Sequence, residues 1–151
     1  MRNKEARYER LFEQIKTLML KTTDPDARMA TIVAVLHHKM DYFFWTGFYF
    51  LVNGELTVKT YQGPLACQVL SPHTGVCWAG IDRQETIVVP DVHQFPGHIA
   101  CDSRSKSEIV VPIRDLSGTI VGVLDVDSQQ PASFDDTDAR WLGAIVKLIY
   151  S

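Results

Sequence analysis

The chain has 151 residues, of which 46% are hydrophobic and 22% charged, and its formal net charge at pH 7 is -3. This composition predicts one globular domain, residues 1–151, with a sizeable core. Lys and Arg are scattered among Asp and Glu without a basic stripe, which excludes nucleic acid as an expected partner. The charged N-terminus is unlike a signal peptide, and no run approaches about 18 apolar residues, so we expect a soluble, cytoplasmic protein with no membrane partner.

Two helices are predicted before any strand. Apolar residues recur at helical spacing from about Glu5 to Leu20, which indicates an amphipathic helix. Asp24 followed by Pro25 is typical of a helix start, because Asp caps the free N–H groups and proline suits the first helical position. The apolar run over 30–40 then supplies a second, more buried helix.

A β-hairpin follows the helices. Residues 43–52 are aromatic and β-rich, and Asn53-Gly54 joins them to a second such run over 56–61. Asn-Gly between two such runs is a strong hairpin signal because both residues tolerate the positive φ angles of a tight turn.

The aromatic residues of the first strand divide between its two faces. Trp45 and Tyr49 share one face, and the other carries Phe44, Phe48 and Phe50. Core packing accounts for most of them, since large aromatic side chains dominate protein cores. One or two could instead form the wall of a pocket for a small methyl-bearing ligand.

The middle of the chain is irregular. Gly and Pro interrupt residues 62–84, with a short helix expected over about 76–82. Residues 86–89 form a short strand, and a loop follows it. Strands over 109–113 and 120–126 are expected to form a second hairpin.

The C-terminal segment is predicted to be a helix. Ser133 with Asp136 three residues later resembles a capping box that opens it. Helices before and after antiparallel strands predict an α+β fold, a central antiparallel β-sheet flanked by helices.

Three cysteines, Cys67, Cys77 and Cys101, lie in one short part of the chain. In a reducing compartment an odd number argues against a disulfide framework and leaves metal binding, redox catalysis or burial open. Cys101 is followed by the polar run Asp102–Lys106, where a thiolate is easiest to stabilise. Cys77 is most simply a small buried residue, and Cys67 lies in a loop from which it could reach Cys101.

A zinc site is the other use of these cysteines. His73, His93 and His98 could join them, but their spacing matches no familiar zinc motif and no Cys-x-x-Cys pair occurs. We therefore expect no metal site.

Three acidic residues are predicted to converge. Strand alternation places Val121, Asp125 and Asp127 on one face, and pairing of Ile113 with Ile120 would set Glu108 directly opposite Asp125. Like charges across a strand pair are unfavourable, so such a cluster needs a lysine, a metal or a ligand's ammonium as partner. The alternative is a strand end in water, where acids are common. The nearby Cys101 thiol favours an active site.

The chain also resembles a known family. The run VVPDVHQFPGHIACDSRSKSEIVVPI over 88–113, followed by GVLDVDS over 122–128, is similar to the free methionine-R-sulfoxide reductases, single-domain enzymes with the GAF fold. WTGFYF, YQGPLAC and GVC extend the resemblance over nearly the whole chain. The family's GAF fold, an antiparallel sheet with helices on its faces, agrees with the pattern above.

The resemblance implies a role for each cysteine. Cys101 would be the catalytic thiol, Cys67 the resolving one, and Cys77 an additional thiol that rescues or relays the disulfide. The cysteine thiolate would attack the sulfur of free methionine sulfoxide, methionine would leave, and Cys101 would become a sulfenic acid. Condensation with Cys67 would give a disulfide that thioredoxin, supplied by NADPH, reduces. No bound cofactor is implied.

The resemblance also assigns the substrate's contacts. Glu108, Asp125 and Asp127 would bind its ammonium and protonate its sulfoxide oxygen, while Trp45 and Tyr49 would flank the methyl end. The sequence leaves the oligomeric state open, a homodimer being one option. Two other functions stay open as well: a non-catalytic GAF module that senses a small molecule, and a thiol redox sensor.

Overall fold

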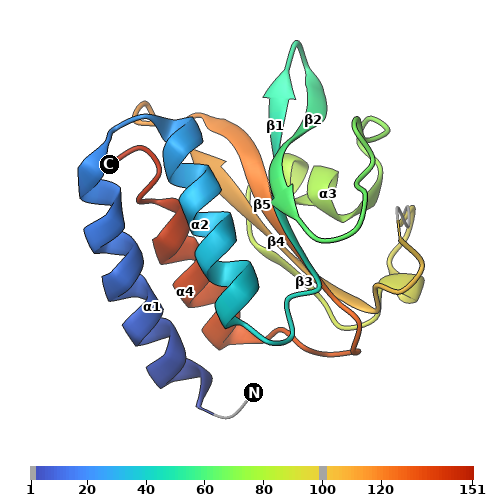
Figure 1. The fold of residues 1–151 in the computed structure, drawn as a ribbon. Helices are drawn as coiled ribbons and strands as arrows, with labels where there is room; N and C mark the ends of the chain where they lie inside the picture. The colour runs from blue at the N-terminus through green and yellow to red at the C-terminus, as the bar shows by residue number, and fades with distance from the viewer. Residues whose placement is uncertain (1–2, 99–101) are drawn as a thin grey trace.

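In the computed structural model the chain forms an antiparallel five-stranded sheet with helices on both faces (Figure 1). The structure describes residues 3–98 and 102–151. The strands lie in the order β2-β1-β5-β4-β3. Their bounds are β1 Trp45–Val52, β2 Glu55–Gln62, β3 Ile87–Val89, β4 Ser107–Arg114 and β5 Ile120–Ser128. The predicted α+β class, with a central antiparallel sheet between helices, is confirmed.

The helices divide unequally between the two faces of the sheet. Helices α2 and α4 pack on one face with α1 outside them, and α3 packs on the other (Figure 1). Their bounds are α1 Lys4–Leu18, α2 Pro25–Lys39, α3 Gly75–Arg83 and α4 Asp136–Val146, with short 3-10 turns η1 Met19–Lys21 and η2 Val92–Gln94. None of the described helices is long and apolar enough to cross a membrane.

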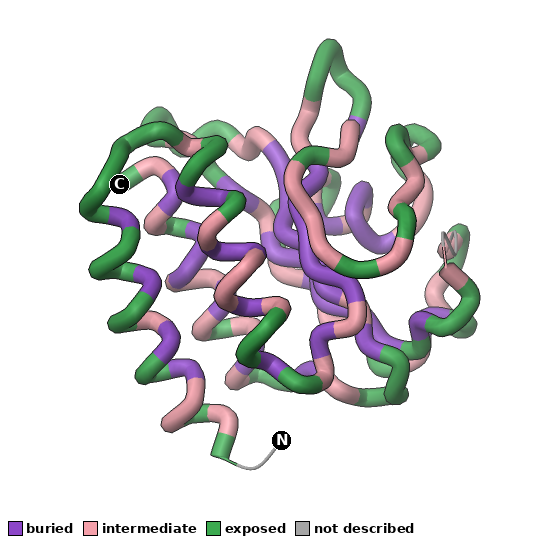
Figure 2. The backbone as a smooth tube through the Cα atoms, in the orientation of Figure 1, coloured by how far each residue is buried: buried purple, intermediate pink, exposed green. Residues whose placement is uncertain are grey.

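This arrangement creates two separate cores. Ile109, Leu124 and Val126 point toward α1, α2 and α4, while Val110 and Val123 point toward α3. The alternation of strand side chains produces this division, because successive residues face opposite sides of the sheet. Figure 2 shows buried residues concentrated along the sheet and on the helix faces that cover it.

The first hairpin forms as the sequence predicts. Asn53 and Gly54 have φ angles of 52° and 81°, and they join β1 to β2 with Val52 opposite Glu55. Positive φ at both turn positions is the backbone geometry that Asn-Gly favours. The predicted start of α2 is also confirmed, because the Asp24 side chain accepts a hydrogen bond from the Ala27 N–H.

The register of the second hairpin differs from the prediction by two residues. Glu108 lies opposite Asp127, and Asp125 lies opposite Val110. The expectation that Glu108 faces Asp125 directly was therefore wrong. A slip of two residues leaves every side chain on its own face of the sheet, whereas a slip of one reverses it. The convergence of the three acids therefore survives the error.

A β-bulge accounts for one residue of this shift, and the turn accounts for the other because Arg114, not Ile113, lies opposite Ile120. Ile113 pairs with Gly122 but Arg114 pairs with Ile120, so Val121 is an extra residue on β5. Val121 consequently packs against the core beneath α1, α2 and α4, not on the acidic face where alternation alone had placed it.

The start of the last helix also needs correction. The capping box of α4 consists of Asp135 and Asp138, whose side chains accept each other's backbone N–H groups. Ser133 and Asp136 had been predicted for this role. The spacing of three residues was right, but Ser133 instead hydrogen-bonds Ser128 through the hydroxyl groups, at 2.7 Å. The true cap lies two residues later.

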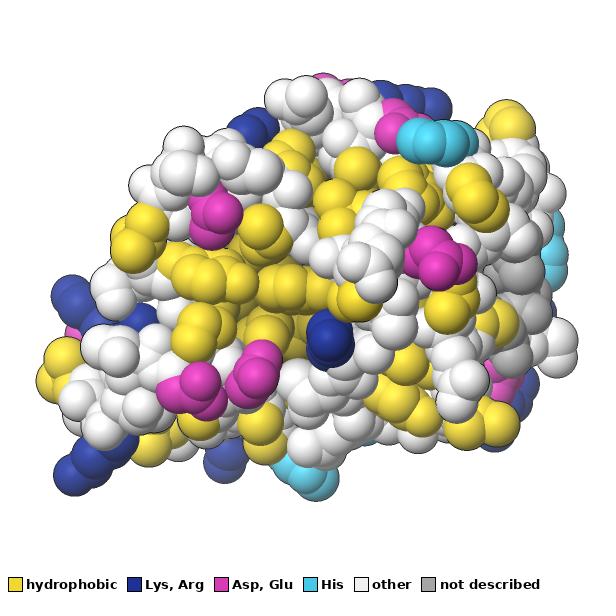
Figure 3. Space-filling view, turned by 90° about the horizontal axis from the view of Figure 1, so that it is seen from above, with side chains coloured by type: hydrophobic (Ala, Val, Ile, Leu, Met, Phe, Trp, Pro, Cys, Tyr) yellow, Lys and Arg dark blue, Asp and Glu magenta, His cyan; other side chains and the backbone are white. Residues whose placement is uncertain are grey.

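Some large apolar side chains reach the surface. Seen from above, hydrophobic side chains gather in a band with acidic groups along its border (Figure 3). The exposed large hydrophobic residues of the described chain are Leu18, Leu20, Val52, Leu65, Val69 and Leu116. Contiguous apolar areas such as the band in Figure 3 can mark association surfaces, and the homodimer stays a prediction.

Arg28 of α2 ties the C-terminus to the helix layer. Its side chain is buried and donates hydrogen bonds to the carbonyl oxygens of Met19 at 2.9 Å, Thr22 at 2.7 Å, Leu148 at 3.0 Å and Ser151 at 2.8 Å. Met19 and Thr22 are the C-cap residues of α1 and η1, where backbone acceptors lack partners within the helix, and Leu148 and Ser151 follow α4. One guanidinium group thus donates hydrogen bonds to carbonyl oxygens of two chain segments that are distant in sequence.

We expect Arg28→Met to lower the free energy of unfolding by at least about 2 kcal/mol, because buried carbonyls would lose charge-assisted partners. Urea denaturation measures the change. Arg140→Met is the matched control: Arg140 pairs with Glu5 at 2.6 Å, but both side chains are at least half exposed, so its loss should cost about 1 kcal/mol or less. Equal effects of the two variants would contradict the assignment.

Candidate active site

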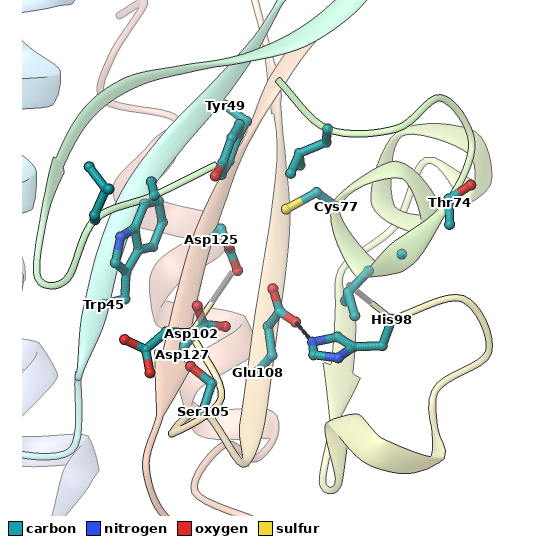
Figure 4. A pocket seen from close by; sticks show the side chains of 15 residues that line it. Trp45, Tyr49, Thr74, Cys77, His98, Asp102, Ser105, Glu108, Asp125 and Asp127 are labelled. Carbon is teal, nitrogen blue, oxygen red and sulfur yellow. Dashed lines mark ion pairs between the residues drawn. The ribbon is translucent and has the colours of Figure 1, made fainter. Parts of the chain in front are cut away.

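A pocket opens between α3 and the sheet, on the face away from the other helices (Figure 4). It contains about 660 Å³ of empty space, counted out to its open mouth. The described lining residues are Trp45, Tyr49, Leu65, Ala66, Leu70, Thr74, Gly75, Val76, Cys77, His98, Asp102, Ser105, Glu108, Asp125 and Asp127.

Three of the lining carboxylates lie close together. Glu108 comes from β4, and Asp125 and Asp127 come from β5. Glu108 is 5% exposed and Asp125 6%. Burial raises the pKa of all three groups, and for Glu108 and Asp127 the negative charge of Asp125 raises it further. The cluster therefore retains protons at pH values where exposed carboxylates have lost them.

Little positive charge balances these acids. No Lys or Arg occurs among the described lining residues. The Nε2 atom of His98 lies 3.7 Å from Oε1 of Glu108, but burial, and then the nearby His93, lower the pKa of His98. Oδ1 of Asp125 is buried without a hydrogen-bond partner in the described part of the chain. Such a cluster is suited to accept protons or a cationic ligand.

The pKa of a fourth acid of the pocket, Asp102, is lowered and not raised. Asp102 is paired with Arg104, whose Nη2 atom lies 2.6 Å from Oδ2. Hydrogen bonds from the Arg104 side chain and backbone lower the pKa of Asp102 to about 2. The pocket thus combines a permanently ionised carboxylate with carboxyl groups that can donate protons. Carboxyl groups whose pKa values differ in this way are typical of acid–base sites.

Cys77 lies beside the acids. It is held by α3, is 5% exposed and has a free thiol. Its sulfur and one carboxylate oxygen each of Glu108 and Asp125 lie within 4.8 Å of one another. Burial raises the pKa of this thiol well above its ordinary value, and the three carboxylates raise it further. Cys77 is therefore a thiol, not a thiolate, in this environment.

Aromatic rings form the wall across from α3. The Trp45 ring stacks with Tyr49 at a centroid distance of 5.8 Å and with Tyr61 at 5.2 Å. Gly47 makes this possible, because a Cβ atom there would lie 2.6 Å from Cη2 of Trp45 and 2.3 Å from Cβ of Tyr61. Any side chain at position 47 would displace the wall.

The same rings hold the loop that carries Cys67. Nε1 of Trp45 donates to the carbonyl of Pro64 at 3.0 Å, and the Tyr49 hydroxyl donates to the carbonyl of Cys67 at 2.9 Å. Leu65 and Ala66 between these anchors line the pocket. The loop is thereby fixed against the cavity, although Cys67 itself is not a lining residue.

The structure brings together most of the site residues that the sequence predicts. The acids Glu108, Asp125 and Asp127, the rings Trp45 and Tyr49, and the thiol Cys77 all line one pocket. Cys101 lies outside the described residues, so its predicted position stays a prediction. The residues just outside the undescribed segment, His98 and Asp102, both line the pocket.

Four polar lining residues were not predicted as parts of this site: Thr74, His98, Asp102 and Ser105. For three of them a signal was available, because His98, Asp102 and Ser105 stand within a few residues of Cys101 in the sequence. His98 had been weighed only as a metal ligand. Its role beside Glu108 depends on a contact between distant segments, which spacing along the chain does not reveal.

Comparison with known proteins agrees with this fold. The sequence matches the family described as "GAF domain" over residues 22–149. The free methionine-R-sulfoxide reductase of Escherichia coli (strain K12) is 37% identical over 144 residues, which cover 95% of this chain and 87% of the relative. The Saccharomyces cerevisiae protein of the same name is 44% identical over 108 residues, or 70% of this chain and 60% of the relative.

A solved structure extends the likeness to three dimensions. The free methionine-R-sulfoxide reductase from Neisseria meningitidis, determined in complex with its substrate, superimposes with a TM-score of 0.89 at 42% identity. The match covers 94% of this chain and 85% of that one. The likeness therefore includes the elements that build the pocket.

The buried acids predict how stability changes with pH. Burial favours the protonated form of Glu108, so above its ordinary pKa of 4.5 the folded protein binds more protons than the unfolded chain. The free energy of unfolding should fall as the pH rises through the folded-state pKa. We expect Glu108→Gln, which stays neutral, to make this fall shallower and to raise stability at neutral pH.

Urea denaturation from about pH 5 to about pH 8 measures this slope. Glu55→Gln removes an exposed carboxylate from β2 and should leave the slope unchanged. A Glu108→Gln slope equal to that of the unmodified protein would contradict a protonated carboxyl group in the folded state.

Proposed function

The chain belongs to the GAF domain family and, within it, to the free methionine-R-sulfoxide reductases, and from this premise we propose that it reduces free L-methionine-R-sulfoxide to methionine. The observation that carries the proposal is the pocket itself. Buried acids without a Lys or Arg partner in the described lining face an apolar aromatic wall.

The pocket's charges suit a free amino acid. An α-ammonium group would supply the positive charge that Glu108, Asp125 and Asp127 lack, and Oδ1 of Asp125 has no competing hydrogen-bond partner among the described residues. The methyl end would lie against Trp45 and Tyr49. A methionine residue inside a peptide has no α-ammonium, so the acids would remain without a cation when such a substrate is offered.

The first chemical step is an oxygen transfer. The Cys101 thiolate attacks the electrophilic sulfur of the sulfoxide while one of the protonated carboxyl groups donates a proton to the sulfoxide oxygen. In the sulfur–sulfur adduct the protonated oxygen is transferred to the Cys101 sulfur; the S–O and S–S bonds to the substrate sulfur break, methionine leaves, and Cys101 becomes a sulfenic acid. The raised pKa values of Glu108 and Asp127 support a proton donor in this place.

The second stage regenerates the thiol. The Cys67 thiol attacks the Cys101 sulfenic acid, water leaves, and a disulfide forms. An external dithiol, thioredoxin in this proposal, reduces the disulfide by exchange, with NADPH as the source of electrons. Cys77 takes no step here because burial keeps it protonated; its relay role stays a prediction.

Activity with separated epimers tests the proposal. We expect free L-methionine-R-sulfoxide, but neither the S epimer nor a peptide sulfoxide, to drive NADPH consumption with thioredoxin and its reductase. Cys101→Ser should lower kcat by about a thousandfold or more, because the nucleophile is lost. Cys67→Ser should still form one equivalent of methionine in a single turnover and then stop.

Two outcomes would contradict this scheme. Absence of turnover of the free R epimer would overturn the enzymatic function and leave the sensing module as the alternative. Turnover that survives Cys101→Ser would overturn the role of that residue alone.

The acid cluster makes a separate prediction. Asp125→Asn and Glu108→Gln should each raise KM about tenfold or more, because each removes a charge-assisted contact to the substrate's ammonium. Steady-state kinetics with free methionine sulfoxide measures the change. Asp82→Asn is the control, since Asp82 lies outside the pocket and pairs with the exposed His73. Unchanged kinetics in the pocket variants would mean that these acids do not bind substrate.

A further inference from the structure

Three potential metal-ligand atoms lie close together at the inner side of the pocket. The Cys77 sulfur and one carboxylate oxygen each of Glu108 and Asp125 lie within 4.8 Å of one another. They come from α3, β4 and β5, elements that pack together in the core, and the three residues are at most 6% exposed. Figure 4 shows the Cys77 sulfur directed toward the side chains of Asp125 and Glu108. The proposed reaction does not use this thiol.

An independent observation indicates that a ligand belongs there. Asp125 is 6% exposed and its Oδ1 atom has no hydrogen-bond partner in the described part of the chain. A buried polar atom without a partner costs free energy comparable to a lost hydrogen bond. No Lys or Arg is present in the described lining to supply the missing contact.

We propose that Zn²⁺ binds at Cys77, Glu108 and Asp125 and closes the pocket to its substrate. Thiolate sulfur and carboxylate oxygen are both ordinary zinc ligands, and three protein ligands with one open position are typical of accessible zinc sites. Zinc bonds of about 2.0–2.3 Å place tetrahedral ligand atoms about 3.5 Å apart. The three atoms lie within 4.8 Å of one another without metal, so binding requires them to approach by at most about 1.3 Å.

The ligand set also discriminates between cations. Ca²⁺ and Mg²⁺ take about six or more oxygen ligands, whereas this group offers two carboxylates and one sulfur. On binding, Zn²⁺ would displace the proton of Cys77 and any proton shared by the two carboxyl groups, and these protons pass to water. The site is consequently expected to bind Zn²⁺ and Co²⁺ but neither Ca²⁺ nor Mg²⁺.

Inhibition follows from shared residues, and this part rests on the proposed function. Glu108 and Asp125 are the acids proposed to bind the substrate's ammonium, so metal and substrate cannot use them together. Zinc should therefore raise the apparent KM for free methionine sulfoxide. The binding of metal itself does not depend on what the substrate is.

Cobalt spectroscopy tests metal binding without activity. Cys67→Ser/Cys101→Ser protein retains Cys77 as its single thiol, so a thiolate-to-cobalt charge-transfer band reports this residue alone. We expect one equivalent of Co²⁺ to produce the band and Zn²⁺ to abolish it. Absence of the band would overturn the proposal, as would its abolition by Mg²⁺ or Ca²⁺.

Further variants in the same background identify the ligands. Cys77→Ala should eliminate the band. Loss of a residue that only hydrogen-bonds to a metal ligand weakens metal affinity roughly 10-fold to 100-fold, and Asp125→Asn should weaken Zn²⁺ affinity by more than this. Asp102→Asn removes one negative charge from the same pocket and should leave the affinity unchanged. Equal losses in Asp125→Asn and Asp102→Asn would indicate general charge attraction and would overturn the ligand assignment.

Thermal unfolding without metal confirms that each variant is folded. If Cys77→Ala does not fold, Asp125→Asn and Glu108→Gln with the cobalt band as readout still decide the outcome. An unchanged band and unchanged Zn²⁺ affinity in both would overturn the site.

Single-turnover reduction by pre-reduced, unmodified protein tests inhibition without added dithiols, which would bind zinc themselves. Zn²⁺ should lower the rate at low substrate and lose its effect at high substrate, and a chelator should restore the rate. Zinc binding without inhibition would overturn only the closure of the pocket. No reduction in the absence of zinc would overturn the proposed function, while the cobalt result would stand.

Discussion

The pairing of β4 with β5 is the interaction on which the pocket depends. These neighbouring strands carry Glu108, Asp125 and Asp127 on the face that α3 covers. Because the strands are hydrogen-bonded to each other, the backbone positions of the three acidic residues are fixed close together. Burial beneath α3 and the loop 63–70 then removes the water that would screen them. The chemical character of the site follows from this one backbone constraint.

Buried acids without a strong cationic partner can be neutralised in three ways: by protons, by the ammonium of a ligand, or by a metal ion. Burial raises the pKa of Glu108 and Asp127, so protons neutralise these groups more readily than they neutralise exposed carboxylates. The proposed reaction uses two of these forms together, an ionised acid to bind ammonium and a protonated acid to donate. In the proposed zinc site, a metal ion neutralises the same acids, and Cys77 is the additional ligand.

The sequence predicted the local features well where a short stretch of chain determines them. Asn53-Gly54 determines a tight turn through its own φ preferences, and Asp24-Pro25 determines a helix start through one side-chain contact. The predicted register of β4 against β5 was wrong because the turn places Arg114, not Ile113, opposite Ile120, and a bulge at Val121 adds one more residue to β5. Bulges of this kind depend on packing on both faces of the sheet, so no local sequence pattern predicted this bulge. The contact of His98 with Glu108 was missed for a similar reason.

The sequence by itself therefore determined the order of the elements, the α+β class, and which side chains of each strand share a face. Strand alternation has a period of two, so the predicted grouping of the acids withstood a register error of two residues. Only the tertiary structure decided how close the acids lie, that the Cys77 thiol joins them, and that no Lys or Arg of the described lining compensates them. Those properties depend on how α3 and distant strands pack together, and packing between distant segments has no signature in local sequence.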